Sequence, residues 1–167
     1  EKTEETRKRY EELKNNKKIV VTSGYFDPLH YGHIELFRLS KQLGDYLIVV
    51  INNDVQTFKK KGFVFMPHEE RAKIISELAS VDEVFISIDE DELVINRVRH
   101  IPVINTLDFI KPHILAKGGD RYVYEIPETP ICRKNGIEVI DGLGAKVQSS
   151  SELVRKSKEI KKEEIIN

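Results

Sequence analysis

Short apolar runs alternate with helical patterns along most of this chain, and that alternation predicts its architecture. β-branched or continuous apolar runs, typical of strands buried on both faces of a parallel sheet, occur at residues 19–22, 46–51, 81–88, 114–116 and 137–140. Helical spacing and helix-start signals occur at residues 34–43, 67–78, 105–110 and 151–162. The order predicts a Rossmann-like, doubly wound α/β/α sandwich with a mostly parallel sheet of about five strands.

The two ends and one internal segment depart from this pattern. Residues 1–17 are almost entirely polar, and opposite charges recur four residues apart, which predicts a charged, solvated N-terminal helix or tail without an apolar stripe to dock on a core. Residues 18–167 contain no repeat or dividing linker, so we expect a single domain that ends in a C-terminal helix. Residues 89–103 are the hardest to interpret, and we take them as an insertion with its own short helix.

Composition then narrows the classes of partner. The 27 Lys and Arg residues nearly balance the 28 Asp and Glu residues, so the net charge of -1 predicts no attraction to nucleic acid or to an anionic membrane. The apolar runs are too short to span a bilayer. The lone Cys132 excludes an internal disulfide and a thiolate zinc site, and no signal peptide opens the chain. These features favour a cytoplasmic protein.

The loop after the first predicted strand is the strongest candidate site, because ligands of open parallel sheets bind beyond the carboxyl ends of the strands. Gly24 allows close approach of a phosphate, and the N-terminus of the following helix offers free N–H groups to an anion. His30 and His33 are three residues apart, so both can face one ligand, and Gly32 leaves room between them. A capped loop with two surface histidines is the structural alternative.

Family resemblance enters at this loop. The string from Gly24 through Tyr25, Phe26 and Asp27 to His33 closely resembles the signature of the cytidylyltransferase-like nucleotidyltransferases, which share an H-x-G-H loop with class I aminoacyl-tRNA synthetases. The resemblance covers about residues 18–155. Further family landmarks follow in order, and they are the lysines at 59–61, the helix start at 66–71, the segment Lys117-Gly118-Gly119-Asp120, and the serines Ser149, Ser150 and Ser151.

The resemblance implies transfer of a nucleoside monophosphate from a nucleoside triphosphate (NTP) to a phosphorylated small molecule, with release of pyrophosphate. Positioning and charge stabilisation supply most of the rate in such reactions. The implied catalytic residues are His30, His33, Lys61 and Arg71. The implied nucleotide-binding residues are Gly24, Tyr25, Phe26, Asp27, Gly32, Lys60, Lys117, Gly118, Gly119, Asp120, Ser149, Ser150 and Ser151. Asp27 has a second interpretation as a side chain that caps the loop, and Asp120 as a turn residue.

The same resemblance implies Mg²⁺ held mainly by the triphosphate oxygens, no protein metal site, and a homodimer. The K-G-G-D segment resembles heptose-phosphate adenylyltransferases and favours ATP with a sugar-phosphate acceptor. Cytidylyltransferases typically carry R-T-x-G-I-S-T before the last helix, where this chain lacks both the arginine and the glycine, and Lys146 is the candidate for the missing charge. CTP with glycerol phosphate or a related polyol or amino-alcohol phosphate is the close alternative.

We keep other functional classes as alternatives and rank them below these two. Flavin adenylyltransferases and phosphopantetheine adenylyltransferases belong to the same superfamily, although the latter carry Thr at the position of His30. A fragment of a class I aminoacyl-tRNA synthetase would need a K-M-S-K-S-like loop, and residues 156–158 resemble such a loop only weakly. A non-catalytic module that only binds nucleotide is the remaining alternative, and pyrophosphate release distinguishes it from an enzyme.

Overall fold

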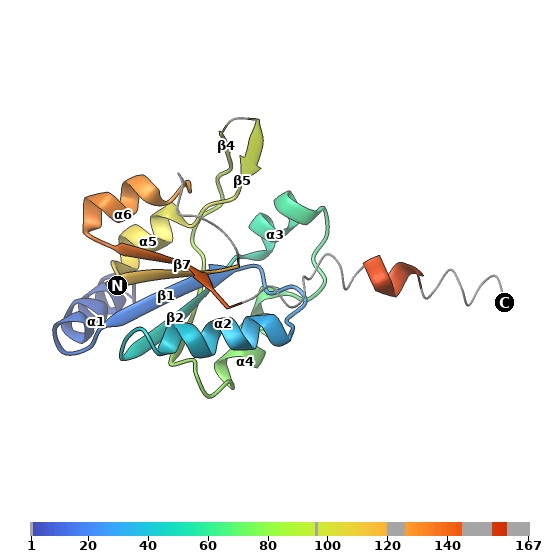
Figure 1. The fold of residues 1–167 in the computed structure, drawn as a ribbon. Helices are drawn as coiled ribbons and strands as arrows, with labels where there is room; N and C mark the ends of the chain where they lie inside the picture. The colour runs from blue at the N-terminus through green and yellow to red at the C-terminus, as the bar shows by residue number, and fades with distance from the viewer. Residues whose placement is uncertain (1, 96, 120–125, 145–154, 160–167) are drawn as a thin grey trace.

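The computed structural model describes residues 2–95, 97–119, 126–144 and 155–159. Five parallel strands form its central sheet in the order β3-β2-β1-β6-β7 (Figure 1). The strands are β1 Ile19–Gly24, β2 Tyr46–Ile51, β3 Glu83–Ile86, β6 Ile114–Gly118 and β7 Glu138–Leu143. The fold class predicted from the sequence is therefore confirmed, and each predicted strand is present, with β3 shorter than the run at 81–88.

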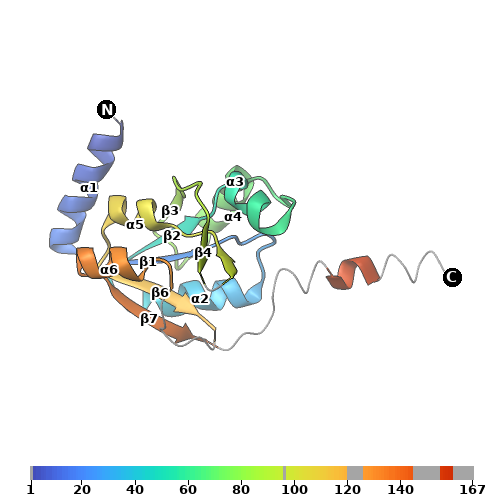
Figure 2. The same cartoon turned by 90° about the horizontal axis from the view of Figure 1, so that it is seen from above.

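Helices cover both faces of this sheet, as Figure 2 shows from above. They are α1 Lys2–Asn16, α2 Tyr31–Lys41, α3 Asp54–Lys61, α4 His68–Ser76, α5 Ile104–Ile110 and α6 Thr129–Asn135. Residues 155–159 are also helical, within the C-terminal helix expected at 151–162. Consecutive strand residues point to opposite faces, so Val20 packs in one apolar core with Phe37 and Ile75, and Val21 packs in the other with Leu107.

The order of the strands decides where a ligand site can form. Strand β1 is central and pairs with β2 on one side and with β6 on the other. The chain crosses one face of the sheet between β1 and β2, and it returns on the other face before β6. A crevice opens beyond the carboxyl ends of the strands at such a reversal. Gly24 at the end of β1 and Gly118 at the end of β6 lie at this edge.

Helix α1 corrects one prediction from the sequence. Residues 2–16 are helical as expected, but Tyr10 is 2% exposed and belongs to a core cluster, against which Leu13 also packs. The Tyr10 hydroxyl donates to Glu83 on β3, and Arg9 donates to both oxygens of the same carboxylate at 2.7 and 3.0 Å. The expectation that this helix lacks an apolar contact with the core is wrong, because two apolar residues three apart are enough to dock it.

The segment at residues 89–103 also differs from the prediction. It forms an antiparallel hairpin of β4 Leu93–Ile95 and β5 Val98–His100 rather than a short helix, and the hairpin projects from the body (Figure 1). Its base is held by Asp89, whose buried carboxylate accepts from the backbone of Asn105 at 2.7 Å and of Thr106 at 2.9 Å. Asp89 thereby joins the base of the hairpin to the start of α5.

Two helices were not expected from the sequence. Lysines 59–61 end the regular helix α3 instead of lying in a loop, because Asn53 and Gln56 close a capping box at its start. The second unexpected helix is α6, which has Pro130 in its first turn. Within the residues described, no helix combines the length and apolar character needed to cross a membrane.

Candidate active site

The loop between β1 and α2 presents two stacked imidazoles at a helix N-terminus. The rings of His30 and His33 lie with centroids 3.7 Å apart and planes 24° from parallel. Nδ1 of His30 accepts from the backbone N–H of Gly32 at 3.1 Å, and Nδ1 of His33 accepts from the backbone N–H of His30 at 3.2 Å. The His30 side chain thus caps the N-terminus of α2, and the His33 side chain accepts from the backbone of His30 in return, which is the arrangement of a capping box.

These bonds determine which ring atoms are free to donate. A neutral imidazole whose Nδ1 accepts a hydrogen bond carries its proton on Nε2. Burial first, and then the nearby His30 and Lys61, together lower the pKa of His33 to about 3. Burial and then Lys61 also lower the pKa of His30. Both rings are therefore neutral at pH 7 and offer two Nε2–H donors, as an anion-binding loop requires.

Phe26 packs against His33 of the histidine pair. Its buried ring meets the edge of His33 at a centroid distance of 4.9 Å and that of Phe37 at 5.1 Å. A Cβ atom on Gly24 would lie 2.8 Å from the Phe26 ring, so only glycine fits there. Packing of Phe26 is therefore a second reason for a glycine at position 24, beside the close approach of a phosphate to its backbone that the sequence predicts.

Asp27 and Lys61 connect the histidine loop to α3 and the segment that follows it. The Asp27 carboxylate is fully buried and accepts from the backbone N–H groups of Phe65 and Met66, each at 2.7 Å. This is the capping role considered for Asp27. The ammonium of Lys61 donates to the Asp27 carbonyl at 2.6 Å and lies 5.6 Å from the centroid of the Tyr25 ring. Burial lowers the pKa of Lys61, and its charge faces the imidazole pair.

Arg71 occupies a different place from the one expected. Its side chain is buried, and every guanidinium nitrogen donates within the protein. Nη1 donates to the carbonyls of Tyr25 and Asn52 at 2.6 and 2.9 Å, Nη2 to Asp54 at 2.7 Å, and Nε to Met66 at 2.8 Å. Arg71 therefore fixes the ends of β1 and β2, and in this structure its guanidinium is not free for the expected contact with a phosphate or with the acceptor.

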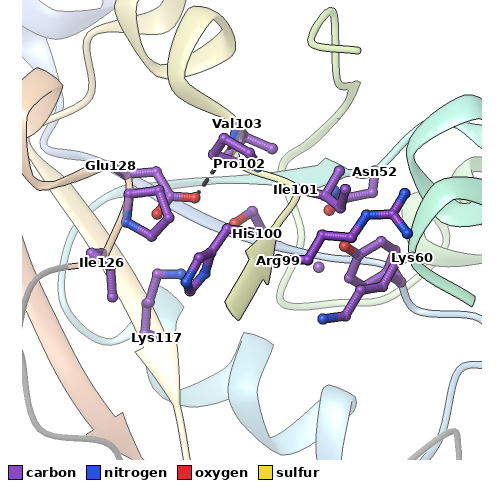
Figure 3. A pocket seen from close by; sticks show the side chains of 14 residues that line it. Asn52, Lys60, Arg99, His100, Ile101, Pro102, Val103, Lys117, Ile126 and Glu128 are labelled. Atoms are coloured by element: carbon purple, nitrogen blue, oxygen red, sulfur yellow. Dashed lines mark hydrogen bonds between the residues drawn. The ribbon is translucent and has the colours of Figure 1, made fainter. Parts of the chain in front are cut away.

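A cavity of about 480 Å³ opens at the same edge of the sheet (Figure 3). It is lined by Ser23, Gly24, Tyr25, Asn52, Lys60, Arg99, His100, Ile101, Pro102, Val103, Lys117, Ile126, Pro127 and Glu128. Burial and then the charge of Glu128 raise the pKa of Tyr25 to about 12, against a smaller lowering by the charge of Arg99. This volume is in the range typical of pockets that bind small molecules.

The predicted site residues divide between these features. Gly24, Tyr25, Lys60 and Lys117 line the cavity, whereas His30, His33 and Lys61 cluster at the start of α2. Gly32 lies in the first turn of α2, and Gly118 and Gly119 follow Lys117 at the end of β6. Asp120, Ser149, Ser150 and Ser151 lie outside the described residues. Within the described ranges, no group of three or more His, Cys, Asp or Glu side chains is arranged to hold a metal ion.

Sequence reasoning missed five polar residues of the cavity, namely Ser23, Asn52, Arg99, His100 and Glu128. Arg99 and His100 reach the cavity from the hairpin, and Glu128 reaches it from the residue before α6. Neither element was predicted, and these residues are distant in sequence from the histidine loop. The position of Asn52, directly after β2, was the one available signal, since it follows the carboxyl end of a parallel strand.

The fold and the paired imidazoles define an α/β nucleotide-binding domain with an H-x-G-H loop. The model of the cytidylyltransferase-like family matches residues 21–160. The chain belongs to the cytidylyltransferase-like family of nucleotidyltransferases.

Two relatives illustrate the range of similarity. The bifunctional protein HldE of Desulfatibacillum aliphaticivorans is 36% identical over 138 residues, which cover 80% of this chain and 24% of that protein. The FAD synthase of Ferroglobus placidus is 32% identical over 121 residues, which cover 72% of each chain. The chain thus spans about a quarter of the length of the HldE proteins it matches.

Solved structures agree with the fold. The lipopolysaccharide core biosynthesis protein of Thermoplasma volcanium shares 29% identity, with a TM-score of 0.59 over 76% of this chain and 95% of that one. Pantoate-beta-alanine ligase of Francisella tularensis has a TM-score of 0.54 over 86% of this chain and 66% of its own, at 17% identity, which shows likeness of fold alone.

Proposed function

We propose that this chain transfers a nucleoside monophosphate, AMP in preference to CMP, from an NTP to a phosphorylated small molecule and releases pyrophosphate. The observation that carries the proposal is the neutral pair His30 and His33, whose Nε2–H donors lie at the N-terminus of α2 beside the Lys61 ammonium. Fixed donors and a partly desolvated cation in this arrangement stabilise negative charge on phosphate oxygens.

The proposed reaction needs no nucleophilic side chain. A phosphate oxygen of the acceptor forms a bond to the α-phosphorus, and the bond from that phosphorus to the oxygen bridging to the β-phosphate breaks. Pyrophosphate leaves with the electron pair of the broken bond. The acceptor oxygen is already anionic, so no general base has to remove a proton from it. The two imidazoles and Lys61 would hold the oxygens on which negative charge increases in the transition state.

Residues outside the described ranges complete the proposal. We assign Ser149, Ser150 and Ser151 to the β- and γ-phosphates and Asp120 to the ribose or base, on the family pattern alone. Mg²⁺ would enter with the triphosphate and neutralise part of its charge. Phosphate oxygens are its expected ligands, which suits a site whose described residues include no cluster of metal-binding side chains.

Support for AMP transfer comes from two sides. The segment Lys117-Gly118-Gly119 begins the string that resembles heptose-phosphate adenylyltransferases, and HldE proteins are among the relatives. This favours a sugar phosphate as the acceptor. The second candidate acceptor is a flavin phosphate, since a FAD synthase matches 72% of this chain and FAD contains an AMP unit.

Pyrophosphate release is the direct test. Each of ATP, CTP, GTP and UTP is supplied with Mg²⁺ and an acceptor panel of sugar phosphates, glycerol 3-phosphate and FMN. We expect ATP to support turnover with one class of acceptor and His33→Ala to lower it roughly 100-fold or more. Glu35→Gln, on the exposed face of the same helix and paired with Arg38, is the matched control and keeps the activity.

The other outcomes separate the alternatives. Turnover with CTP alone would replace the adenylyl proposal with cytidylyl transfer. Binding of a triphosphate without turnover on any acceptor would favour a non-catalytic nucleotide-binding module. A folded protein that binds none of the four triphosphates would contradict the assignment of the histidine loop.

A further inference from the structure

One carboxylate in the cavity is buried and only half satisfied. Glu128 is 6% exposed and lines the cavity just before α6. Its Oε1 accepts a long hydrogen bond of 3.4 Å from the backbone N–H of Val103, drawn as the dashed line in Figure 3. Its Oε2 has no hydrogen-bond partner in the structure as described. A buried carboxylate oxygen without a donor is costly, and Glu128 forms part of the wall of a ligand-sized cavity, so a ligand group that reaches into this wall can supply the missing donor.

Cationic side chains line the same cavity without pairing with this carboxylate. In Figure 3 Glu128 and Lys60 lie on opposite sides of the view, with His100 between them and Lys117 below Glu128. Among the described residues no ion pair joins Glu128 to any of these groups, although Arg99 pairs with Glu92. The cavity therefore keeps an acidic group and basic groups apart, which suits a ligand that carries both a hydrogen-bond donor and an anion.

We infer that Glu128 is a specificity-determining residue of an acceptor pocket, where it accepts a hydrogen bond from a hydroxyl group of the acceptor while the basic side chains hold its phosphate. The inference rests on the proposed function and deepens it. Apolar residues Ile101 and Pro102 complete the wall against which the carbon skeleton would pack.

The chemistry of the lining favours a hydroxyl group over other donors. An ammonium group on the acceptor would also satisfy Oε2, but it would enter a cavity lined by Lys60 and Lys117 and be repelled by them. An acceptor with no donor would leave Oε2 unsatisfied, and sites with unpaired polar groups reject such analogues strongly. Glu128 thus selects acceptors with a hydroxyl group against those without a donor, and Lys60 and Lys117 disfavour cationic acceptors.

The family pattern assigns four lining residues of the cavity, Gly24, Tyr25, Lys60 and Lys117, to the nucleotide, and this inference gives the cavity to the acceptor instead. Ser23, Gly24 and Tyr25 form part of its wall and lead directly into the loop that carries His30. The imidazoles themselves are not among the lining residues. A ligand in the cavity can therefore extend an anionic end toward the histidine loop while its body remains beside Glu128.

The test uses matched pairs of ligands that differ only in hydroxyl groups. The full chain is titrated calorimetrically, without nucleotide, with glycerol 3-phosphate against propyl phosphate and with glucose 1-phosphate against cyclohexyl phosphate. We expect the wild type to bind the hydroxylated member of at least one pair about tenfold more tightly or better. Glu128→Met removes this preference, and Lys117→Ala weakens both members of the pair alike.

Two further variants protect the interpretation. Glu128→Gln keeps an acceptor for the Val103 N–H and replaces Oε2 by an NH₂ group, so it folds even if the Met variant does not. It is expected to reduce the preference about threefold or more. Glu11→Gln, an exposed carboxylate on α1, is the matched control and leaves every affinity unchanged.

Absence of discrimination in both pairs, failure of the wild type to bind any of the four ligands, or full discrimination by folded Glu128 variants would overturn the inference. Its failure is distinguishable from failure of the proposed function, because the titrations contain no nucleotide. Pyrophosphate release by a chain whose Glu128 variants keep the preference contradicts the role of Glu128 alone. Hydroxyl discrimination without pyrophosphate release contradicts the proposed enzyme and supports Glu128 as a ligand contact.

Discussion

The backbone N–H of His30 donates a hydrogen bond to Nδ1 of His33, and the two rings stack 3.7 Å apart. This hydrogen bond is part of the cap of α2 and also fixes the position of the His33 ring. It leaves the proton of His33 on Nε2, and the bond from Gly32 does the same for His30. The pair is thus organised before any ligand arrives, so in the proposed reaction the two rings need no reorientation as negative charge develops on the phosphate oxygens.

The lowered pKa of His33 predicts a pH dependence of stability. In the unfolded chain an ordinary histidine gains a proton below about pH 6.5, whereas folded His33 stays neutral until about pH 3. The unfolded state therefore binds more protons in this window, and the contribution of His33 is full above pH 6.5 and declines as the pH falls toward 3. We expect the free energy of unfolding in urea to fall with acid more steeply for the wild type than for His33→Gln.

Parallel curves for the two proteins would contradict this prediction. A direct check is the ring proton resonance of His33, which should not titrate between about pH 7.5 and 5.

Lys61 is expected to control both turnover and the ionisation of the imidazoles. Burial and then the charge of Lys61 lower the pKa of His30, so Lys61→Met should raise that pKa part of the way toward the ordinary value, as followed by NMR titration. The same change should lower kcat, because a cation beside the phosphates is lost. Lys60→Met is the matched comparison, since Lys60 is exposed and lines the cavity instead. Equal pKa values of His30 in both variants would contradict the assignment of Lys61.

Arg71 is predicted to act through the backbone it holds. Arg71→Met leaves the buried carbonyls of Tyr25 and Asn52 and the carboxylate of Asp54 without their donor. Loss of one partner from a buried ionic network costs about 3–5 kcal/mol, so the free energy of unfolding should fall by that order. Lys73→Met, on the exposed face of the same helix, should change it by less than about 0.5 kcal/mol.

A direct contact of Arg71 with substrate would give a different result. Stability would then hold while the affinity for triphosphate collapsed, and that pair of observations would restore the role expected from the sequence.

Tyr10 is predicted to hold helix α1 on the sheet. Its ring packs edge-on against Phe109 at 6.2 Å, and its hydroxyl donates to the Glu83 carboxylate. Tyr10→Ala should cost about 3–5 kcal/mol, as for other large aromatic side chains removed from a core. Tyr10→Phe removes only the hydrogen bond and should cost about 1.5–3 kcal/mol. Urea unfolding measures both, and values near zero for Tyr10→Ala would show that α1 is detached in solution.

The sequence itself was sufficient for the sheet and for the histidine loop. Buried parallel strands are continuous apolar runs, and their alternation with helices leaves few topologies open. The H-x-G-H string lies within ten residues of one strand end, so its capping and phosphate-binding chemistry is local. The roles of His30, His33 and Lys61 follow from residues whose spacing is visible in the sequence, and they stay predictions until tested.

Only the tertiary structure decided how distant residues combine. The charged residues around Tyr10 show no apolar stripe and predict a solvated helix. The Tyr10 ring nevertheless packs against apolar residues of β3 and α5. Arg71 looked like a phosphate ligand, yet four hydrogen-bond acceptors from three segments surround it. The cavity that contains Glu128 joins strand ends, a hairpin and α6. Such sites depend on long-range packing, which periodicity and local spacing do not encode.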